Sequence, residues 1–381
     1  MYIFAINKDV YHIYQRALAL SISKEFVHHF NGQSAFNYRQ DSEQENRRRE
    51  LLAVEEEAQK EKIIAQHGEA HFRHQVSSQL EAKIMTQVNI ELDNKERLLR
   101  KTLQVEQAAP DILDLLAVKA ASIKRITPLA KNLTWLATDL IKLVNKPQYR
   151  KRADVPVHDA SLAVSYIGLE NLKLVMPTFI VKHWLPISTS PYPLMKRKLW
   201  SDSLSIALAS RILAKAHNLD EYSAFALGML SNVGMLAITR SFLAQFNEIH
   251  GAELRQAYEN KDKRLHDILL AIKPPAHLLL TQLAERGYQI GAQLVEQMHF
   301  ERLAIVEPMF DLAYVNDFKK MHPLSHIVIK ARAFVDVRNL TNEDLISADD
   351  AQHFLSNSHL SADDITLLKK SDIDHLTLKF K

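Results

Sequence analysis

The chain has 381 residues, of which 47% are apolar, and this is enough for two or more structural units around a sizeable core. Its 48 basic and 45 acidic residues leave a formal net charge of +3, which is too small to indicate a nucleic-acid partner. Because the chain has no cysteine, disulfides, thiolate nucleophiles and cysteine-ligated metals are excluded.

Charged residues interrupt the first apolar positions of the chain, at Lys8, Asp9 and Arg16. They argue against a secretory signal. We also expect no uncharged apolar run of about 18 residues, the length that a membrane-spanning helix needs. The sequence therefore predicts a cytoplasmic protein without a membrane partner.

Residues 1–40 form an N-terminal segment whose fold the sequence leaves open. Their apolar positions suit a strand followed by a helix: Tyr2, Phe4, Ile6, Val10, Ile13, Tyr14 and Leu18.

Residues 41–107 are predicted to form one long, charged, amphipathic helix or a helical hairpin. Acidic residues precede basic ones by four positions, as in Glu43/Arg47 and Glu56/Lys60, and each such pair stabilises a helix by roughly 0.2–0.5 kcal/mol. Apolar residues recur mostly in steps of four, at Phe72, Val76, Leu80, Ile84, Val88, Leu92, Leu99 and Leu103. Such a stripe drifts around the helix and lacks a strict heptad seam. It either packs on the following domain or serves homo-oligomerisation or partner docking.

Three histidines in this region, His67, His71 and His74, have the spacing of metal ligands on one helical face. Three imidazoles on a single straight helix rarely close around one ion. A hydrated polar face is the preferred interpretation.

Residues 108–340 carry apolar residues at helical spacing and are predicted to form a compact helical domain. One helix should end near Asn145, because asparagine tolerates left-handed geometry and Pro147 prevents continuation. Gly168 should allow a turn between two helices, and Gly228 and Gly234 remove Cβ where backbones approach closely.

Several segments of this domain resemble the HDOD (HD-related output domain) family, which is related to metal-dependent HD phosphohydrolases. Gly228-Met229-Leu230-Ser231-Asn232-Val233-Gly234 corresponds to a family segment that reads Gly-Leu-Leu-His-Asp-Ile-Gly. The resemblance spans about residues 110 to 340, and its other matching positions are Asn145, Tyr149, Gly168, Trp200 and Gly291. It implies an all-α fold with an HD-like bundle preceded by the long helical region.

The resemblance also identifies the positions at which related enzymes hold their metal ions. In this chain those positions are Asp202, Ser231, Asn232, Gly287 or a close neighbour, and Arg332. A hydroxyl and an amide bind divalent ions feebly, and a guanidinium has no lone pair and a permanent positive charge. One plausible oxygen ligand, Asp202, remains, so we expect no metal, no cofactor and no phosphohydrolase activity.

The resemblance implies a non-catalytic bacterial signalling protein. We expect it to act through protein partners, with the degenerate pocket serving structure or recognising an anion. Two alternatives stay open. One is a divergent phosphohydrolase that acts on nucleotides or cyclic dinucleotides through Asp202 and ligands from elsewhere. The other is a self-associating scaffold.

Residues 341–381 are predicted to form a short helical appendage. Two sequences resemble capping boxes with an acid at the fourth position, Thr341 to Asp344 and Ser361 to Asp364. His322, which precedes Pro323, should begin a helix.

Overall fold

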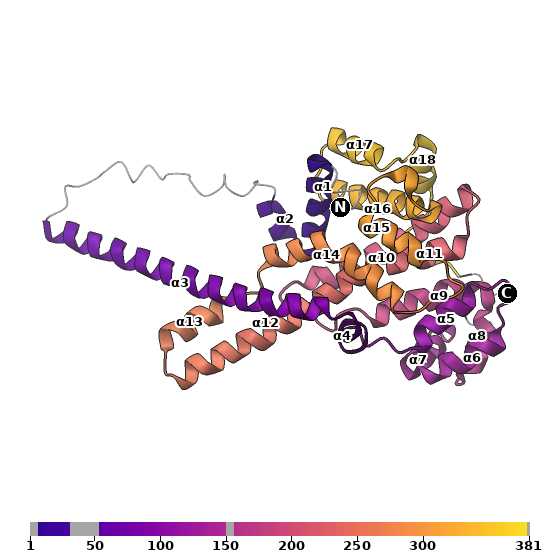
Figure 1. Cartoon of the computed structure of the whole chain (residues 1–381), viewed down its shortest axis with the longest axis horizontal. Helices are drawn as coiled ribbons and strands as arrows, with labels where there is room; N and C mark the ends of the chain where they lie inside the picture. The colour runs from indigo at the N-terminus through magenta and orange to yellow at the C-terminus, as the bar shows by residue number, and fades with distance from the viewer. Residues whose placement is uncertain (1–6, 31–52, 150–155, 379–381) are drawn as a thin grey trace.

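The computed structural model describes residues 7–30, 53–149 and 156–378, and for residues 53–67 it describes the backbone alone. Within these ranges all regular structure is helical, which confirms the predicted all-α class (Figure 1).

The centre of the bundle is made by five helices. α10 (Pro193–Ala216) packs on α11 (Glu221–Leu230) and α16 (Pro323–Thr341), and α12 (Val233–Glu259) packs on α14 (Ala276–Glu296). Residues Tyr222–Leu230 of α11 are all buried. They have no polar face because α9 (Leu169–His183), α10 and α16 contact α11.

The expectation that the chain has no long apolar run is wrong, because α11 and α12 together contain one. The segment Glu221–Glu259 contains an 18-residue window long and apolar enough to cross a membrane, but that window is entirely buried inside the protein. Its apolar length reflects a central position in the core.

Two glycines of the predicted motif lie where backbones touch. A Cβ on Gly234 would lie 2.0 Å from the carbonyl oxygen of Gly287 and 2.5 Å from the nitrogen of Gly291, so only glycine fits at this position between α12 and α14. A Cβ on Gly228 would lie 2.6 Å from the Cα of Ala207 in α10. These contacts support the proposed role of the glycines in close approach.

The second group of helices lies beside this centre, at the lower right of Figure 1. It contains α5 (Ala108–Leu116), α6 (Ile123–Asn132), α7 (Thr134–Val144), η3 (Pro147–Tyr149) and α8 (Ala160–Ile167), followed by α9. The predicted turn between α8 and α9 is at Gly168, whose φ is +74°.

Asn145 ends α7 as predicted, but the expected left-handed geometry is wrong, because its φ is −85° and its ψ is −3°. Its side chain has a different function. The amide donates to the carbonyl of Val157 (2.7 Å) and accepts from its N–H (2.9 Å), so it holds the segment that leads into α8. Tyr149 lies nearby, and its carbonyl accepts from the Tyr166 hydroxyl.

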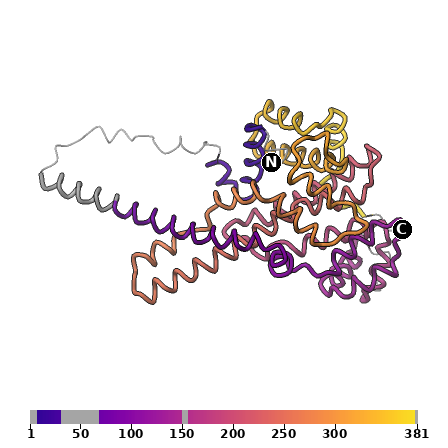
Figure 2. Tube along the Cα trace, in the orientation of Figure 1, coloured from indigo at the N-terminus to yellow at the C-terminus, as the bar shows by residue number. Residues whose placement is uncertain are grey.

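The long helix α3 (Ala53–Asp93) projects from the bundle, with α12 and α13 (Lys263–Ala271) beside its C-terminal half (Figures 1 and 2). We call α3, α13 and the part of α12 that follows Phe246 the arm. The predicted helix to residue 107 is too long, because Asn94 caps α4 (Lys95–Arg97) and the chain continues into η2 (Leu98–Thr102). The predicted stripe is buried from Val76 to Leu92, which agrees with packing on the following domain. His71 and His74 are exposed, and the side chain of His67 lies outside the described residues.

The N-terminal helices are α1 (Lys8–Ile22) and α2 (Lys24–Phe30). The helix predicted after the first apolar residues is confirmed, whereas the strand predicted around Tyr2, Phe4 and Ile6 lies outside the described residues. α1 packs on α10, α14, α16 and α17 (Ala348–Asn357), so it is part of the bundle.

After α14, the chain forms α15 (Val306–Tyr314) and η4 (Phe318–Lys320) and enters α16, whose N-cap is His322 as predicted. The predicted helix start at Thr341 is wrong, because Thr341 is the last residue of α16 and Ser347 caps α17 instead. The capping box of Ser361 and Asp364 at the start of α18 (Ala362–Lys370) is confirmed.

Replacing Gly234 with alanine should destabilise the protein, because the new methyl group would collide with the α14 backbone. We expect the free energy of unfolding in urea to fall by roughly 3 kcal/mol. Gly251→Ala is the matched control in the same helix, since the nearest atom to its new Cβ is 3.7 Å away. That variant should be unchanged or more stable by up to about 1 kcal/mol. Equal effects at both positions would contradict the proposed backbone contact.

Candidate functional site

The five positions identified from the sequence lie on different helices that meet in the core. Asp202 is in α10, Ser231 and Asn232 join α11 to α12, Gly287 is in α14 and Arg332 is in α16. The structure brings Asn232 and Arg332 into direct contact. The other three positions have different surroundings.

The guanidinium of Arg332 is the centre of the site. It donates from Nη1 to Oδ1 of Asn232 (2.6 Å) and from Nε to Oδ2 of Asp336 (3.0 Å). Its Nη2 lies 3.9 Å from the sulfur of Met235, and its Cζ lies 5.6 Å from the centre of the Tyr14 ring. A guanidinium directed by a carboxylate, an amide oxygen and an aromatic face is held in one orientation.

The amide of Asn232 extends this network into α10. Its Nδ2 donates to the hydroxyl of Ser203 (3.1 Å), which in turn donates to the carbonyl of Leu199 (2.7 Å). Asn232 is 2% exposed and Ser203 is fully buried, so these bonds satisfy groups that water does not reach.

Ser231 and Gly287 are close to the network without joining it. The hydroxyl of Ser231 donates to the carbonyl of Gly228 (2.8 Å), within its own helix turn. A Cβ on Gly287 would lie 3.3 Å from Cγ of Met235, so Met235 fills the space beside this residue. Neither position presents an oxygen or nitrogen side-chain ligand to Arg332.

Asp202 lies at the edge of the cluster and is partly buried. Its Oδ1 accepts a hydrogen bond from Nδ2 of Asn339 (3.0 Å). Burial raises the pKa of Asp202, and the positive charges of Lys198 and Arg332 offset part of that rise.

Sequence reasoning missed Asp336, Ser203, Met235 and Tyr14. The spacing of Arg332 and Asp336, four residues apart in one helix, is a signal for the ion pair. Tyr14 had no such signal, because it belongs to a helix more than 300 residues away from Arg332 in the chain.

The ion pair is buried on both sides, with 6% of the Arg332 side chain and 4% of the Asp336 side chain exposed. Burial raises the pKa of Asp336 to about 6, although the charge of Arg332 lowers it in part. For Arg332, burial disfavours the charged form, but Asp336 and the surrounding tyrosines hold its pKa well above the usual value. Arg332 therefore keeps its charge at every pH at which the protein would be studied.

This set of side chains does not fit a divalent metal ion. Among the residues that the structure describes, no group of three or more histidine, cysteine, aspartate or glutamate side chains could hold one. The carboxylate of Asp336 is already bonded to Arg332, and the fixed positive charge of Arg332 would repel a second cation.

α1 closes the site from the outside. It contacts the three helices that carry Asp202, Gly287 and Arg332, and it places the fully buried ring of Tyr14 over the guanidinium. Ser231, Asn232, Arg332 and Asp336 are between 1% and 5% exposed. A substrate could not reach them without a rearrangement of the surrounding helices.

Comparison with known proteins identifies the class of this bundle. The family model of the HDOD domain matches residues 103–300, which is just over half of the chain, and the chain belongs to the HDOD family. A search among curated proteins finds no significant match.

Two crystal structures, both of proteins from Shewanella amazonensis SB2B, are similar in architecture. One, provisionally named a phosphohydrolase, is 17% identical with a TM-score of 0.45, and the match covers 72% of this chain and 92% of the other. The second, provisionally named a metal-dependent phosphohydrolase, is also 17% identical, with a TM-score of 0.38 and coverage of 74% and 95%. Neither is similar enough for a residue-by-residue comparison.

The matched region contains Asp202, Ser231, Asn232 and Gly287 but ends before Arg332. Tyr14 and Asp336 also lie outside it. The groups that surround the guanidinium therefore come from the family domain and from the segments on both sides of it.

Arg332→Met should destabilise the protein more strongly at pH 8 than at pH 5. A carboxyl with a raised folded-state pKa stabilises the protein most below the unfolded pKa of about 3.8, and this contribution is lost as the pH rises through about 6. Without Arg332 the pKa of Asp336 rises further. Above pH 6 the ionised form of this buried carboxyl therefore destabilises the folded protein still more. We expect a loss of about 3 kcal/mol or more at pH 8.

The measurement is urea unfolding of wild type and variant at both pH values. Arg302→Met is the control, because Arg302 also pairs with an aspartate, Asp114. Burial alone would raise the pKa of Asp114, but hydrogen bonds, chiefly from backbone N–H groups, outweigh it and lower that pKa. A loss for Arg332→Met that is the same at pH 5 and pH 8 would contradict the proposed coupling to Asp336.

Proposed function

We propose that this HDOD protein is a non-catalytic regulatory module that acts by binding protein partners. The observation that carries the proposal is the buried guanidinium of Arg332, bonded to Asn232 and Asp336. The sequence resemblance assigns Asn232 and Arg332 to positions at which related enzymes bind metal. Hydrolysis of a phosphoester by this superfamily requires a cation that binds substrate and activates water. Here the positive charge belongs to the guanidinium of Arg332, which cannot activate a water as a metal ion does. It is buried and already bonded to Asn232 and Asp336.

The chemistry of the remaining groups supports the same proposal. An arginine has no lone pair for a metal and its charge does not titrate away. The hydroxyl of Ser231 is used within its own helix turn, and the amide of Asn232 is used on both sides, by Arg332 and Ser203. The site has become part of the core.

The arm is the surface that we propose for protein contacts. It projects from the bundle in Figure 1 and exposes large apolar side chains at Ile90 (57% exposed), Tyr258 (75%) and Leu270 (60%). α3 is fixed to α12 by the ion pair of Lys83 and Glu253 (2.6 Å) and to α13 by Arg264, which lies 4.4 Å from the Phe72 ring centre. Apolar groups on a fixed, projecting element suit partner recognition. A cytoplasmic, bacterial signalling role is part of the proposal and follows from the family.

Self-association through the arm is the second candidate, favoured by the same exposed side chains. It is tested by light scattering on the full chain and on a Tyr258→Ser, Leu270→Ser double variant. A dimer that becomes a monomer in the variant would support self-association, and a monomer in both would exclude it.

The protein should not hydrolyse bis(p-nitrophenyl) phosphate or a cyclic dinucleotide in the presence of Mn²⁺ or Mg²⁺. The physical reason is that Asp202 is the single carboxylate left at the former metal positions. Product release should equal that of buffer, and elemental analysis should find well under one equivalent of transition metal per chain.

Asp202→Ala separates the proposal from its competitor, a divergent phosphohydrolase, and Asp349→Ala, on the exposed start of α17, is its control. Turnover that is lost in the first variant and kept in the second would overturn the non-catalytic assignment.

A further inference from the structure

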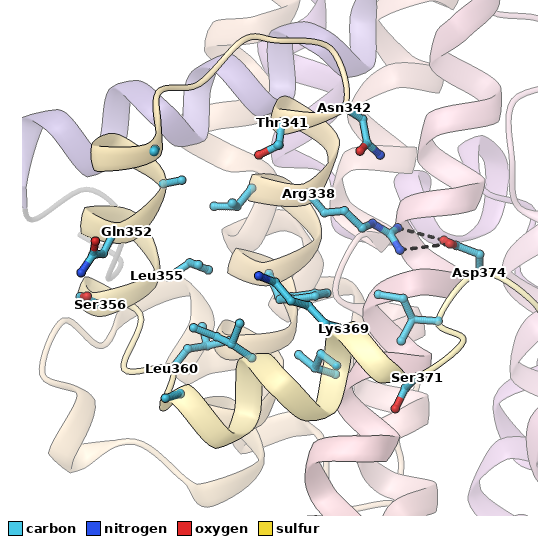
Figure 3. A pocket seen from close by; sticks show the side chains of 18 residues that line it. Arg338, Thr341, Asn342, Gln352, Leu355, Ser356, Leu360, Lys369, Ser371 and Asp374 are labelled. Carbon is cyan, nitrogen blue, oxygen red and sulfur yellow. Dashed lines mark hydrogen bonds and ion pairs between the residues drawn. The ribbon is translucent and has the colours of Figure 1, made fainter.

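The C-terminal helices form a cavity that the former metal site does not use. α16, α17 and α18 enclose a cup of about 820 Å³ (Figure 3). This volume lies within the range of about 300–1,000 Å³ that is typical of small-molecule sites. All the residues that line it belong to the described part of the chain.

The cup exists because its two outer helices rest on different parts of the bundle. α17 packs on α16 and α1, whereas α18 packs on α10. The buried Asp364 fixes α18, since it accepts from Lys330 of α16 (2.8 Å) and is bonded to His217 at the end of α10 (2.8 Å). Those hydrogen bonds lower the pKa of Asp364 to about 2 against the effect of burial, so this carboxylate is ionised at neutral pH. The walls are therefore fixed by interactions outside the cup.

Of the 18 residues that line the cup, ten are apolar and eight are polar or charged. Its apolar part includes Phe334 and Leu368, which are buried, and Leu355, Leu360 and Ile365, which are partly exposed. This composition is typical of sites that bind the apolar body of a small molecule.

The charges of the lining determine which head group would fit. Arg338 forms two bonds with Asp374 (2.9 and 3.1 Å), so these opposite charges satisfy each other, as the dashed lines in Figure 3 show. Lys369, the other charged residue of the lining, extends over the cup in Figure 3 and has no ion-pair partner among the described residues. The lining therefore offers one uncompensated positive charge above an apolar floor.

We infer that this cup binds an amphipathic monoanion, a small molecule with one carboxylate or sulfonate on a hydrocarbon or aromatic body. The apolar body would cover Phe334 and its neighbours, and the single negative charge would pair with Lys369. A nucleotide or other polyanion fits poorly, because it would meet one free cation and the carboxylate of Asp374. This ligand class is independent of the proposed partner-binding role and of the closed site around Arg332.

The test uses the full chain and 8-anilinonaphthalene-1-sulfonate, a fluorescent aromatic monoanion. Wild type should bind it at one saturable site, and Ala351→Trp should abolish binding, because the indole fills the cup from α17. Lys369→Gln should weaken binding about three- to fivefold, the effect of losing one partly exposed ion pair. Lys370→Gln, the neighbouring exposed lysine that does not line the cup, is the matched control and should bind as wild type does.

Competition with two straight-chain molecules tests the charge separately. Laurate should displace the probe at least threefold more effectively than 1-dodecanol, which has the same chain length and no charge. Near-UV circular dichroism verifies that Ala351→Trp is folded. If Ala351→Trp is not folded, Ala348→Phe is used in its place, because its ring fills the cup from the preceding turn of α17.

Four results would overturn the inference. Binding that Ala351→Trp or Ala348→Phe leaves unchanged would place the probe elsewhere. Equal affinities of the Lys369 and Lys370 variants, or equal displacement by laurate and dodecanol, would contradict recognition of an anion. A dimer in light scattering that Ala351→Trp converts to a monomer would show that a second copy of the chain covers the cup.

Discussion

The architecture depends on keeping one guanidinium charged inside a helical core. A buried cation is costly unless ionic and hydrogen-bonding partners surround it. Arg332 obtains them from three helices: Asp336 from its own helix, Asn232 from the start of α12 and the Tyr14 ring from α1. Asn232 and Tyr14 thereby fix the positions of α12 and α1 relative to α16. The site is a structural junction between helices of the bundle.

This junction explains why the N-terminal helix is part of the bundle. The HDOD family model covers residues 103–300, yet both Tyr14 and the Arg332–Asp336 pair lie outside that range. The family domain therefore supplies Asn232 and Ser203, and the flanking segments supply the charge pair and its aromatic cover. The same α1 also supports α17, one wall of the C-terminal cup. A single helix thus covers the guanidinium of Arg332 and helps to shape the C-terminal cup.

The sequence predicted the features that local chemistry determines. The helix periodicity, the close glycine contact at Gly234 and the capping box at Ser361 follow from neighbouring residues or from steric limits on one position. It failed where long-range contacts decide. Asn145 acts through side-chain bonds to Val157, not through left-handed geometry. The end of the long helix before Gln107 was also missed, although its signal is local, because Asn94 caps α4 by accepting from the N–H of Arg97. The sequence singled out Arg332 but not its partner Tyr14, because no local pattern connects residues from opposite ends of the chain.

The central claim is that an arginine side chain has taken the place of a metal ion. Its most direct test is an anomalous diffraction measurement on crystals of the full chain grown with Mn²⁺. The account predicts no anomalous peak among Asp202, Asn232 and Asp336, with the guanidinium of Arg332 bonded to both Asn232 and Asp336. A strong Mn²⁺ peak coordinated by Asp202 or Asp336, with Arg332 displaced from these partners, would contradict it.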